Sequence, residues 1–212
     1  MHITVFGATE QVGKRVVQQA LNRGYTVTAF GRNVDSLIDA DNRNEKLIAQ
    51  KGYVFDAKDV FNALNGADAV VSVLGGAFDG ADKSRSLGIK NIITQMEAKG
   101  IKRLIALGEL GILSENEETL LIDSENYPEE YKPIGMEHLK AFEFLQASSL
   151  DWTFYCPSNI IDADETGLFI TSINIAPEPN SFKINAGDLA LSMLNAIEKK
   201  EFIREKIGIA GL

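Results

Sequence analysis

The chain has 212 residues, of which 45% are hydrophobic and 24% are charged, and its formal net charge is −9. These proportions are typical of a globular protein and exclude the disordered and fibrous classes. The acidic excess would repel a polyanion, so we expect no nucleic-acid partner. No apolar run reaches the roughly 18 residues that a membrane helix needs, so we expect no membrane partner either.

Short apolar runs alternate with segments of helical period along the chain. We predict strands at residues 2–6, 26–30, 46–50, 69–74, 103–107, 152–156 and 206–210. We predict helices at residues 12–23, from Asp56 to Gly66, at 84–99 and 136–147, and from an Asp188 cap to about Ile197. Apolar strands separated by helices indicate a parallel sheet covered on both faces, hence a single doubly wound, Rossmann-type α/β domain over residues 1–212.

Two stretches, 111–135 and 161–187, interrupt this alternation. Both follow the carboxyl end of a predicted strand, where sheets of this kind bind ligands. We interpret them as insertions that form substrate loops, with plain surface insertions as an equal alternative.

The first predicted strand runs into Gly7-Ala8-Thr9-Glu10-Gln11-Val12-Gly13, which opens the first predicted helix. In this context a glycine turn binds the diphosphate of a dinucleotide. Gly7 permits the tight turn, Gly13 lets the helix pack closely, and the free amides of the first helical turn face the phosphates. A turn that serves only the fold is the alternative. Glu10 replaces the middle glycine of the pattern, and its carboxylate would repel a diphosphate unless it points to solvent.

Arg32 follows the second predicted strand, in Gly31-Arg32-Asn33. An acidic residue near this place would hydrogen-bond the ribose 2′-hydroxyl of NAD, whereas an arginine suits a 2′-phosphate. We therefore predict NADP(H) rather than NAD(H) as the cofactor. An unliganded surface arginine is the alternative.

With these residues in place, the chain resembles the atypical short-chain dehydrogenase/reductase group. Within it, the chain is most similar to small NmrA-like NAD(P)H-binding proteins of the biliverdin-IXβ/flavin reductase type. The likeness spans nearly the whole chain through the turn at 7–13, Arg32-Asn33, 56–60, 63–75, Glu143…Leu145, 148–153, Pro157 and 187–190.

The resemblance implies a nicotinamide near the ends of the fourth, fifth and sixth predicted strands. It implies cofactor contacts at Gly7, Thr9, Gln11, Val12, Gly13, Arg32, Leu74, Gly75, Gly76, Leu107 and Pro157. Our candidate set also includes Glu10, Asn33, Tyr53 and Gly108.

The chain departs from the family pattern at three places. The family often has Gly-Asp after the third strand, and this chain has Gly52-Tyr53, so that Tyr53 either stacks on the adenine or simply packs. Glu109 stands where the family has an active-site serine. The sixth strand ends in Cys156-Pro157 where Arg-Pro is common.

The Tyr-x-x-x-Lys pair of the usual short-chain dehydrogenases is absent. Counting back from Glu143 puts Gly135 and Leu139 at its two places. Hydride transfer to a planar acceptor such as a flavin or quinone does not need this pair. Its proton can come from water, and the protein mainly positions two rings. We therefore predict an NADP(H)-dependent oxidoreductase with a small planar acceptor.

Two residues are candidate proton donors in such a reaction. His138 titrates near neutrality, and Glu109 at a strand's carboxyl end is a candidate for a raised pKa. The alternatives are a surface helix residue for His138 and a solvated loop carboxylate for Glu109.

The single cysteine, Cys156, cannot form an internal disulfide. This suits a reducing compartment, and the amino terminus lacks the pattern of a signal peptide, so we expect a cytoplasmic protein. We expect Cys156 to be a buried small hydrophobe rather than a nucleophile. The histidines and the cysteine are too far apart in the sequence to suggest a metal site.

Other readings of the whole chain remain open. It is alternatively a non-catalytic NADP-sensing protein that binds a partner through residues 111–135, or a fold whose dinucleotide site is lost through Glu10. The sequence leaves open a homodimer or another protein partner.

Overall fold

The computed structural model describes residues 1–37 and 44–212. Its centre is an eight-stranded sheet in the order β3-β2-β1-β4-β5-β6-β10-β8. The strands are β1 (His2–Phe6), β2 (Thr26–Gly31), β3 (Leu47–Lys51), β4 (Ala69–Ser72), β5 (Arg103–Leu107), β6 (Asp151–Pro157), β8 (Phe169–Ile173) and β10 (Glu205–Gly211). Strands β1 to β6 and β10 pair in parallel, whereas β8 pairs antiparallel with β10. The predicted fold class is confirmed, and the expectation of a wholly parallel sheet is wrong at this edge.

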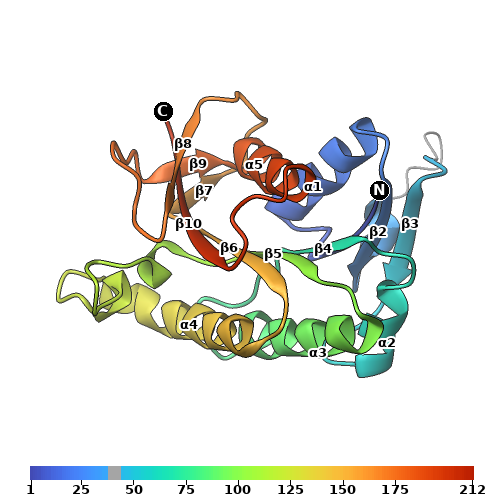
Figure 1. Cartoon of the computed structure of the whole chain (residues 1–212), viewed down its shortest axis with the longest axis horizontal. Helices are drawn as coiled ribbons and strands as arrows, with labels where there is room; N and C mark the ends of the chain where they lie inside the picture. The colour runs from blue at the N-terminus through green and yellow to red at the C-terminus, as the bar shows by residue number, and fades with distance from the viewer. Residues whose placement is uncertain (38–43) are drawn as a thin grey trace.

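Helices cover both faces of the sheet (Figure 1). On one face α1 (Gln11–Asn22) packs against α5 (Ala186–Glu198), and on the other α3 (Ile89–Lys99) packs between α2 (Ala57–Ala63) and α4 (Lys132–Ala147). Each layer encloses its own apolar core, and the sheet residues alternate between the two cores. Because the parallel strands are buried on both faces, they read in the sequence as unbroken apolar runs.

The chain reverses its direction of travel across the sheet at β1, which lies between β2 and β4. Residues 1–51 build the sheet outward from β1 to β2 and β3, and the chain then crosses back to form β4 on the other side of β1. This arrangement creates a topological switch point, and a crevice forms there at the carboxyl ends of the strands. The turn that follows Phe6 therefore lies at the edge of the sheet where a ligand is expected.

The insertion at 161–187 contains more structure than the sequence indicates. It includes β8 and β9 (Lys183–Asn185), and β9 pairs in parallel with β7 (Asn159–Ile161), just before the insertion, in a separate two-stranded sheet. These strands were not predicted because β8 is mostly half-buried and β9 has only three residues, so neither has a buried apolar run. The insertion at 111–135 holds the short 3₁₀ helices η3 (Leu110–Ile112), η4 (Leu121–Asp123) and η5 (Glu129–Tyr131).

Several predicted boundaries need correction. Helix α4 begins at Lys132, with Pro133 in its first turn, rather than at Met136. The predicted helix at 84–99 begins with a π-helical turn, η2 (Ser84–Gly88). Asp188 does not cap α5, which begins at Ala186; its carboxylate instead accepts hydrogen bonds from the backbone of Thr166 and Gly167, both at 2.7 Å.

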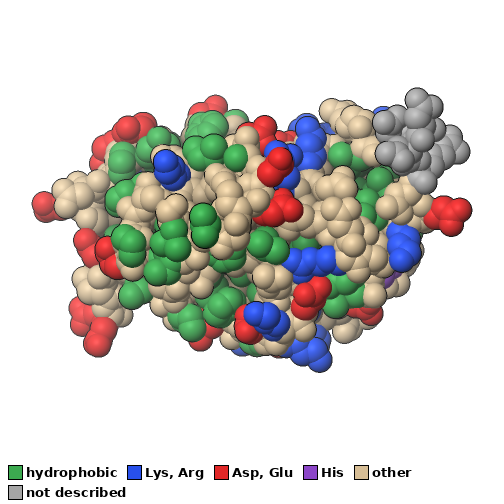
Figure 2. Space-filling view, turned by 90° about the horizontal axis from the view of Figure 1, so that it is seen from above, with side chains coloured by type: hydrophobic (Ala, Val, Ile, Leu, Met, Phe, Trp, Pro, Cys, Tyr) green, Lys and Arg blue, Asp and Glu red, His purple; other side chains and the backbone are tan. Residues whose placement is uncertain are grey.

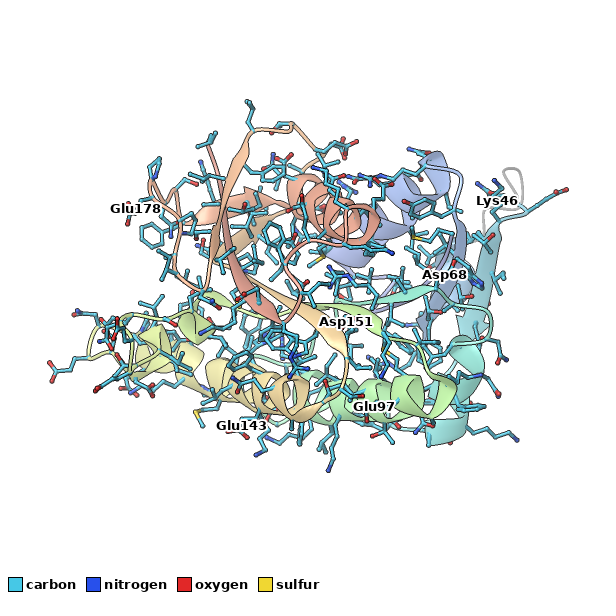
Figure 3. The ribbon with its side chains drawn as sticks, in the orientation of Figure 1. Lys46, Asp68, Glu97, Glu143, Asp151 and Glu178 are labelled. Carbon is cyan, nitrogen blue, oxygen red and sulfur yellow. The ribbon has the colours of Figure 1, made fainter. Side chains whose placement is uncertain are left out.

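Charged residues lie at the amino-terminal edge of the sheet and on the outer helices (Figure 3). Asp68 and Asp151 stand at the starts of β4 and β6, and Glu97 and Glu143 lie on α3 and α4. Figure 2 shows hydrophobic side chains gathered on the part of the surface that carries β8 and β9. None of the helices within residues 1–37 and 44–212 is long and apolar enough to cross a membrane.

Candidate functional site

A cleft of about 880 Å³ opens at the carboxyl ends of β1, β2 and β4. This volume lies in the range of small-molecule and cofactor sites. The predicted cofactor residues that line it are Gly7, Thr9, Glu10, Arg32, Asn33, Tyr53, Leu74, Gly75 and Gly76. Sequence reasoning did not name Phe55, Ala77, Ala81, Asp82, Lys83, Ser84 and Leu87, which also line it. Their only sequence signal is that most of them follow the carboxyl end of β4.

The turn at 7–13 depends on its two glycines for its geometry. Gly7 has φ +81°, and a Cβ there would lie 2.5 Å from the carbonyl oxygen of Val73. A Cβ on Gly13 would lie 2.0 Å from the carbonyl oxygen of Gly7. Helix α1 therefore starts in direct contact with the end of β1. No side chain of the described residues caps its first turn, so the amides there remain available to an anion.

Glu10 lies in the mouth of the cleft. It is the N-cap residue of α1, is exposed, and makes no capping hydrogen bond with its side chain. One of its carboxylate oxygens lies 4.0 Å from the position that a Cβ on Gly75 would take, so the side chain reaches toward the end of β4. Because like charges repel, a diphosphate bound in the cleft would push this free side chain outward.

Arg32 lies at the end of β2 and faces into the cleft. Its positive charge acts on Asp82 of the opposite wall. The pKa of Asp82 lies below its usual value, mainly through a hydrogen bond from Ser84, with the charges of Arg85 and Arg32 adding to the effect. Arg32 is exposed on the cleft wall, where a ligand phosphate can reach its guanidinium. Its role as a phosphate partner rather than an unliganded surface arginine stays a prediction.

Tyr53 follows β3 at the outer end of the cleft. Its side chain is 63% exposed, although its backbone N–H donates to the Asp59 carboxylate at 3.0 Å. An exposed ring on an anchored backbone favours stacking against a ligand over packing in the core. Phe55, also exposed at 54%, lines the same end of the cleft.

The wall that follows β4 is fixed by buried charged groups. Arg85 donates to the carbonyl oxygens of Gly76 at 2.9 Å and Ala77 at 3.1 Å. The buried carboxylate of Glu137, on α4, accepts hydrogen bonds from Lys83 at 2.7 Å and from the Ser86 hydroxyl. These contacts hold η2 against α4, so the wall is attached to the helix layer beneath it.

The remaining predicted cofactor residues do not line the cleft. Gln11 donates from its side chain to the Ile160 carbonyl at 3.4 Å, and Val12 and Gly13 are buried beneath the turn. Leu107, Gly108 and Pro157 lie at the ends of β5 and β6 and are half-buried or buried. The cleft thus contains only part of the predicted dinucleotide site: it includes Gly7, Thr9, Arg32, Tyr53 and the end of β4. The candidates at the ends of β5 and β6 are not among the residues that line it.

Glu109 lies just after β5 and is partly buried. Its carboxylate accepts hydrogen bonds from the backbone N–H of Gly111 at 2.9 Å and from the Tyr127 hydroxyl at 3.1 Å. Burial raises its pKa, and the two hydrogen bonds oppose that rise. The direction of this shift agrees with the expected one, and Glu109 is half-buried rather than fully solvated. Its role as a proton donor stays a prediction.

His138 is buried, so its expected position on the surface of the helix is wrong. It is 5% exposed and packs near Phe154 on the sheet side of α4. Burial lowers its pKa to about 3. The imidazole is therefore neutral at pH 7, which disfavours the predicted proton donation by an imidazolium. Cys156 is fully buried, as predicted, and burial raises the pKa of its thiol.

A family model described as NAD(P)H-binding matches residues 7–200. The chain belongs to this NAD(P)H-binding family. The match begins at Gly7, directly after β1, and includes β2 and β4, which also border the cleft. The cleft and its glycine turn thus lie within the part of the chain that defines the family.

Individual relatives agree with this membership. The uncharacterized protein YwnB of Bacillus subtilis is 26% identical over 99% of the chain and 98% of its own length. A crystal structure from Burkholderia pseudomallei, provisionally named an exported protein, has 30% identity, a TM-score of 0.84 and 99% coverage of both chains. A Streptococcus pneumoniae structure with the provisional name NADH-flavin reductase has 27% identity, a TM-score of 0.83 and 100% coverage of both chains.

A short-chain dehydrogenase/reductase from Veillonella parvula, crystallised with NADP, shares the fold at 18% identity and a TM-score of 0.75, covering 99% of this chain and 94% of its own. The family and these structures together show an NAD(P)H-binding, oxidoreductase-like fold. Within the described residues, no group of three or more His, Cys, Asp and Glu side chains is arranged to hold a metal ion.

The residues of this NAD(P)H-binding protein fit a dinucleotide at its adenosine end. Uncapped amides of α1 suit the diphosphate, the Arg32 guanidinium suits a phosphate, and the exposed Tyr53 ring suits a purine. The carboxylates of Glu10 and Asp82, which also line the cleft, oppose this fit.

Proposed function

We propose that the protein is an NADP(H)-dependent reductase that delivers hydride to a small planar acceptor such as a flavin or a quinone. The observation that carries this proposal is the uncapped glycine turn at 7–13 opening onto the same cleft as Arg32. Membership of the NAD(P)H-binding family supports the cofactor class. The provisional name of the S. pneumoniae relative, NADH-flavin reductase, supports the acceptor class but names the other nicotinamide cofactor.

The chain's own groups divide the work of binding. The α1 amides and the positive end of the helix dipole would hold the diphosphate, while Arg32 would pair with the 2′-phosphate. Tyr53 would stack on the adenine. When bound, the dihydronicotinamide supplies the hydride, and the protein's contribution is to hold the acceptor ring against it.

The test is turnover of NADPH with two acceptors, riboflavin and a naphthoquinone, followed by loss of the nicotinamide absorbance. We expect turnover above the protein-free rate with at least one acceptor, and a lower KM for NADPH than for NADH. Rates no higher than the protein-free reaction with every planar acceptor, at saturating NADPH, would remove the reductase proposal.

A second function, binding NADP(H) as a sensor without catalysis, is favoured by one observation. Leu107, Gly108 and Pro157, predicted to surround the nicotinamide, lie outside the cleft. Calorimetric NADPH binding without turnover, together with a partner retained through residues 111–135, would favour the sensor over the reductase.

A further inference from the structure

Glu109 and Tyr127 form a carboxyl–phenol pair at the start of the insertion that follows β5. They come from separate turns of the chain, and the Tyr127 hydroxyl meets the Glu109 carboxylate at 3.1 Å. The other carboxylate oxygen accepts from the Gly111 backbone N–H at 2.9 Å, which fixes its direction. Both side chains are partly exposed, so the pair is neither sealed in the core nor free in solvent.

Two glycines provide the space for this pair. A Cβ on Gly135, in the first turns of α4, would lie 2.7 Å from the Tyr127 hydroxyl oxygen and 3.3 Å from a Glu109 oxygen. A Cβ on Gly111 would lie 2.5 Å from a Glu109 oxygen and 2.6 Å from the Tyr127 ring. The phenol of Tyr127 thus occupies the space into which any side chain at position 135 would project. Gly135 of α4 has no side chain to fill this space, and the phenol that fills it comes from Tyr127 in the insertion 111–135.

The pair stands at the same edge of the sheet as the cleft. In the β4–β5 register, Ser72 lies opposite Ala106. The segments that follow these two strands contain Gly75, which lines the cleft, and Glu109. Glu109 therefore follows the strand next to β4, at the edge of the sheet where Leu107 and Gly108 of the predicted nicotinamide site also lie.

The groups around Glu109 act on its pKa in opposite directions. Burial raises it, and the hydrogen bonds from Gly111 and Tyr127 oppose that rise. On β6 the facing group is the buried Cys156 thiol, whose pKa burial raises well above its usual value. Tyr127 keeps its proton because burial and the Glu109 charge raise its pKa, with Tyr131 adding to that rise. Lys206 of β10 is near Cys156, but its ammonium donates to the Ile112 carbonyl and to the Ser114 hydroxyl. On α4, the buried His138 is neutral.

We propose that Glu109, held in place by the Tyr127 hydroxyl, is the proton donor of the proposed reductase, and that this pair selects an acceptor whose hydride-receiving ring carries a carbonyl oxygen, such as a quinone. The proposal rests on the proposed function and names its acceptor class. The phenol already donates to one carboxylate oxygen, so the protonated carboxyl offers its single O–H to the acceptor oxygen while Tyr127 fixes its direction. Such a donor stabilises negative charge as it develops in the transition state.

The proton transfer balances without a further reactant. As the acceptor ring gains the hydride and its two electrons, negative charge forms on the carbonyl oxygen. The Glu109 O–H bond breaks, its proton forms a new O–H bond on the acceptor, and the electron pair stays on the Glu109 carboxylate. Tyr127 keeps its proton and continues to donate its hydrogen bond to Glu109. Water restores the Glu109 proton after the reduced acceptor leaves.

The pair predicts a definite pH dependence. The donor form is the protonated one, so kcat with a quinone is full below the Glu109 pKa and falls as the pH rises through it. The Tyr127 hydrogen bond lowers that pKa by stabilising the carboxylate. Its loss must therefore move the fall in kcat to higher pH, a shift that a merely structural contact would not produce.

The test is the kcat–pH profile of NADPH oxidation by a naphthoquinone in the wild type, Glu109→Gln and Tyr127→Phe. Glu109→Gln should lower kcat by about 100-fold and remove the pH dependence, since general acid catalysis contributes about that factor or more. Tyr127→Phe should lower kcat about tenfold, the scale of one hydrogen bond, and shift the profile to higher pH. The matched controls, Glu118→Gln and Tyr131→Phe in the same insertion, should retain the wild-type profile.

A second readout needs neither cofactor nor turnover. Carboxyl ¹³C NMR of the cofactor-free protein would follow Glu109, with Glu109→Gln identifying its signal. We expect a pKa above that of an ordinary glutamate, which rises further in Tyr127→Phe. It should also rise in Gly135→Ala, because the added methyl displaces the phenol.

The outcomes separate this proposal from the proposed function. If the wild type reduces a quinone while Glu109→Gln and Tyr127→Phe keep its rate and profile, the pair is not the proton donor and the reductase stands. NADPH binding without reduction of any quinone also overturns the pair. If calorimetry detects no NADPH binding, the proposed function fails first and the pair with it. An ordinary Glu109 pKa, unchanged in Tyr127→Phe, overturns the pair even where turnover is found.

Discussion

At the scale of single residues, the site is defined by which charges face the cleft. Arg32 and Asp82 face each other from opposite walls, and Glu10 reaches across the mouth toward Gly75. The sequence identified Arg32 and Glu10 from their positions beside a strand end and within a glycine turn. It did not identify Asp82 or Tyr127, because each acts through a residue distant in the sequence and no local pattern records the contact.

Arg32 should decide between the two nicotinamide cofactors. Arg32→Ala should weaken NADPH binding by about 1.5 to 3 kcal/mol, the scale of a hydrogen bond to a charged group, and leave NADH almost unchanged because NADH has no 2′-phosphate. Calorimetric titration of both cofactors measures this, with Lys51→Ala, an exposed β3 residue outside the cleft, as the control. An equal loss of binding free energy for NADPH and NADH would show that Arg32 does not bind the 2′-phosphate.

At the scale of elements, the sequence predicted the seven parallel strands of the main sheet and the five α-helices of the described residues, because most of them bury an apolar run or stripe. It failed in 161–187, where β8 is mostly half-buried and β9 has only three residues. It also misread Asp188, since an acidic residue in a first helical turn resembles a cap, whereas this one binds the Thr166 backbone of the insertion. Local patterns therefore predicted elements, and tertiary contacts decided the details.

The junction of β1 and α1 is the element on which the cleft depends. In Gly13→Ala, the new Cβ would meet the Gly7 carbonyl oxygen at 2.0 Å, so the helix must move away from the strand. Overpacking of this kind costs about 1 to 3 kcal/mol, and we expect that loss in the free energy of urea unfolding, together with weaker NADPH binding.

The control for this substitution is Lys14→Ala, which introduces the same side chain at the next, exposed position of α1. A surface change there should alter stability by no more than about 0.5 kcal/mol. If Gly13→Ala were as stable as Lys14→Ala and bound NADPH equally well, the close approach of α1 to the turn would not matter for the site.

At the scale of the whole molecule, a protein with a net charge of −9 is expected to bind an anionic dinucleotide. Long-range electrostatics oppose this, so binding must depend on groups within the cleft, where the helix dipole, the α1 amides and Arg32 act at short range. The fold supplies that place through its switch point between β2 and β4. We therefore expect the cleft to bind an anion although the molecule as a whole is acidic.

Calorimetric titration of NADPH into the wild-type protein and into Glu10→Gln tests whether the cleft binds the anionic dinucleotide. We predict saturable binding of one NADPH per chain to the wild type, and tighter binding to Glu10→Gln because a repelling charge is gone. Absence of heat from the wild type at millimolar NADPH would show that the cleft does not hold the dinucleotide. Binding restored only in Glu10→Gln would identify the Glu10 carboxylate as the cause.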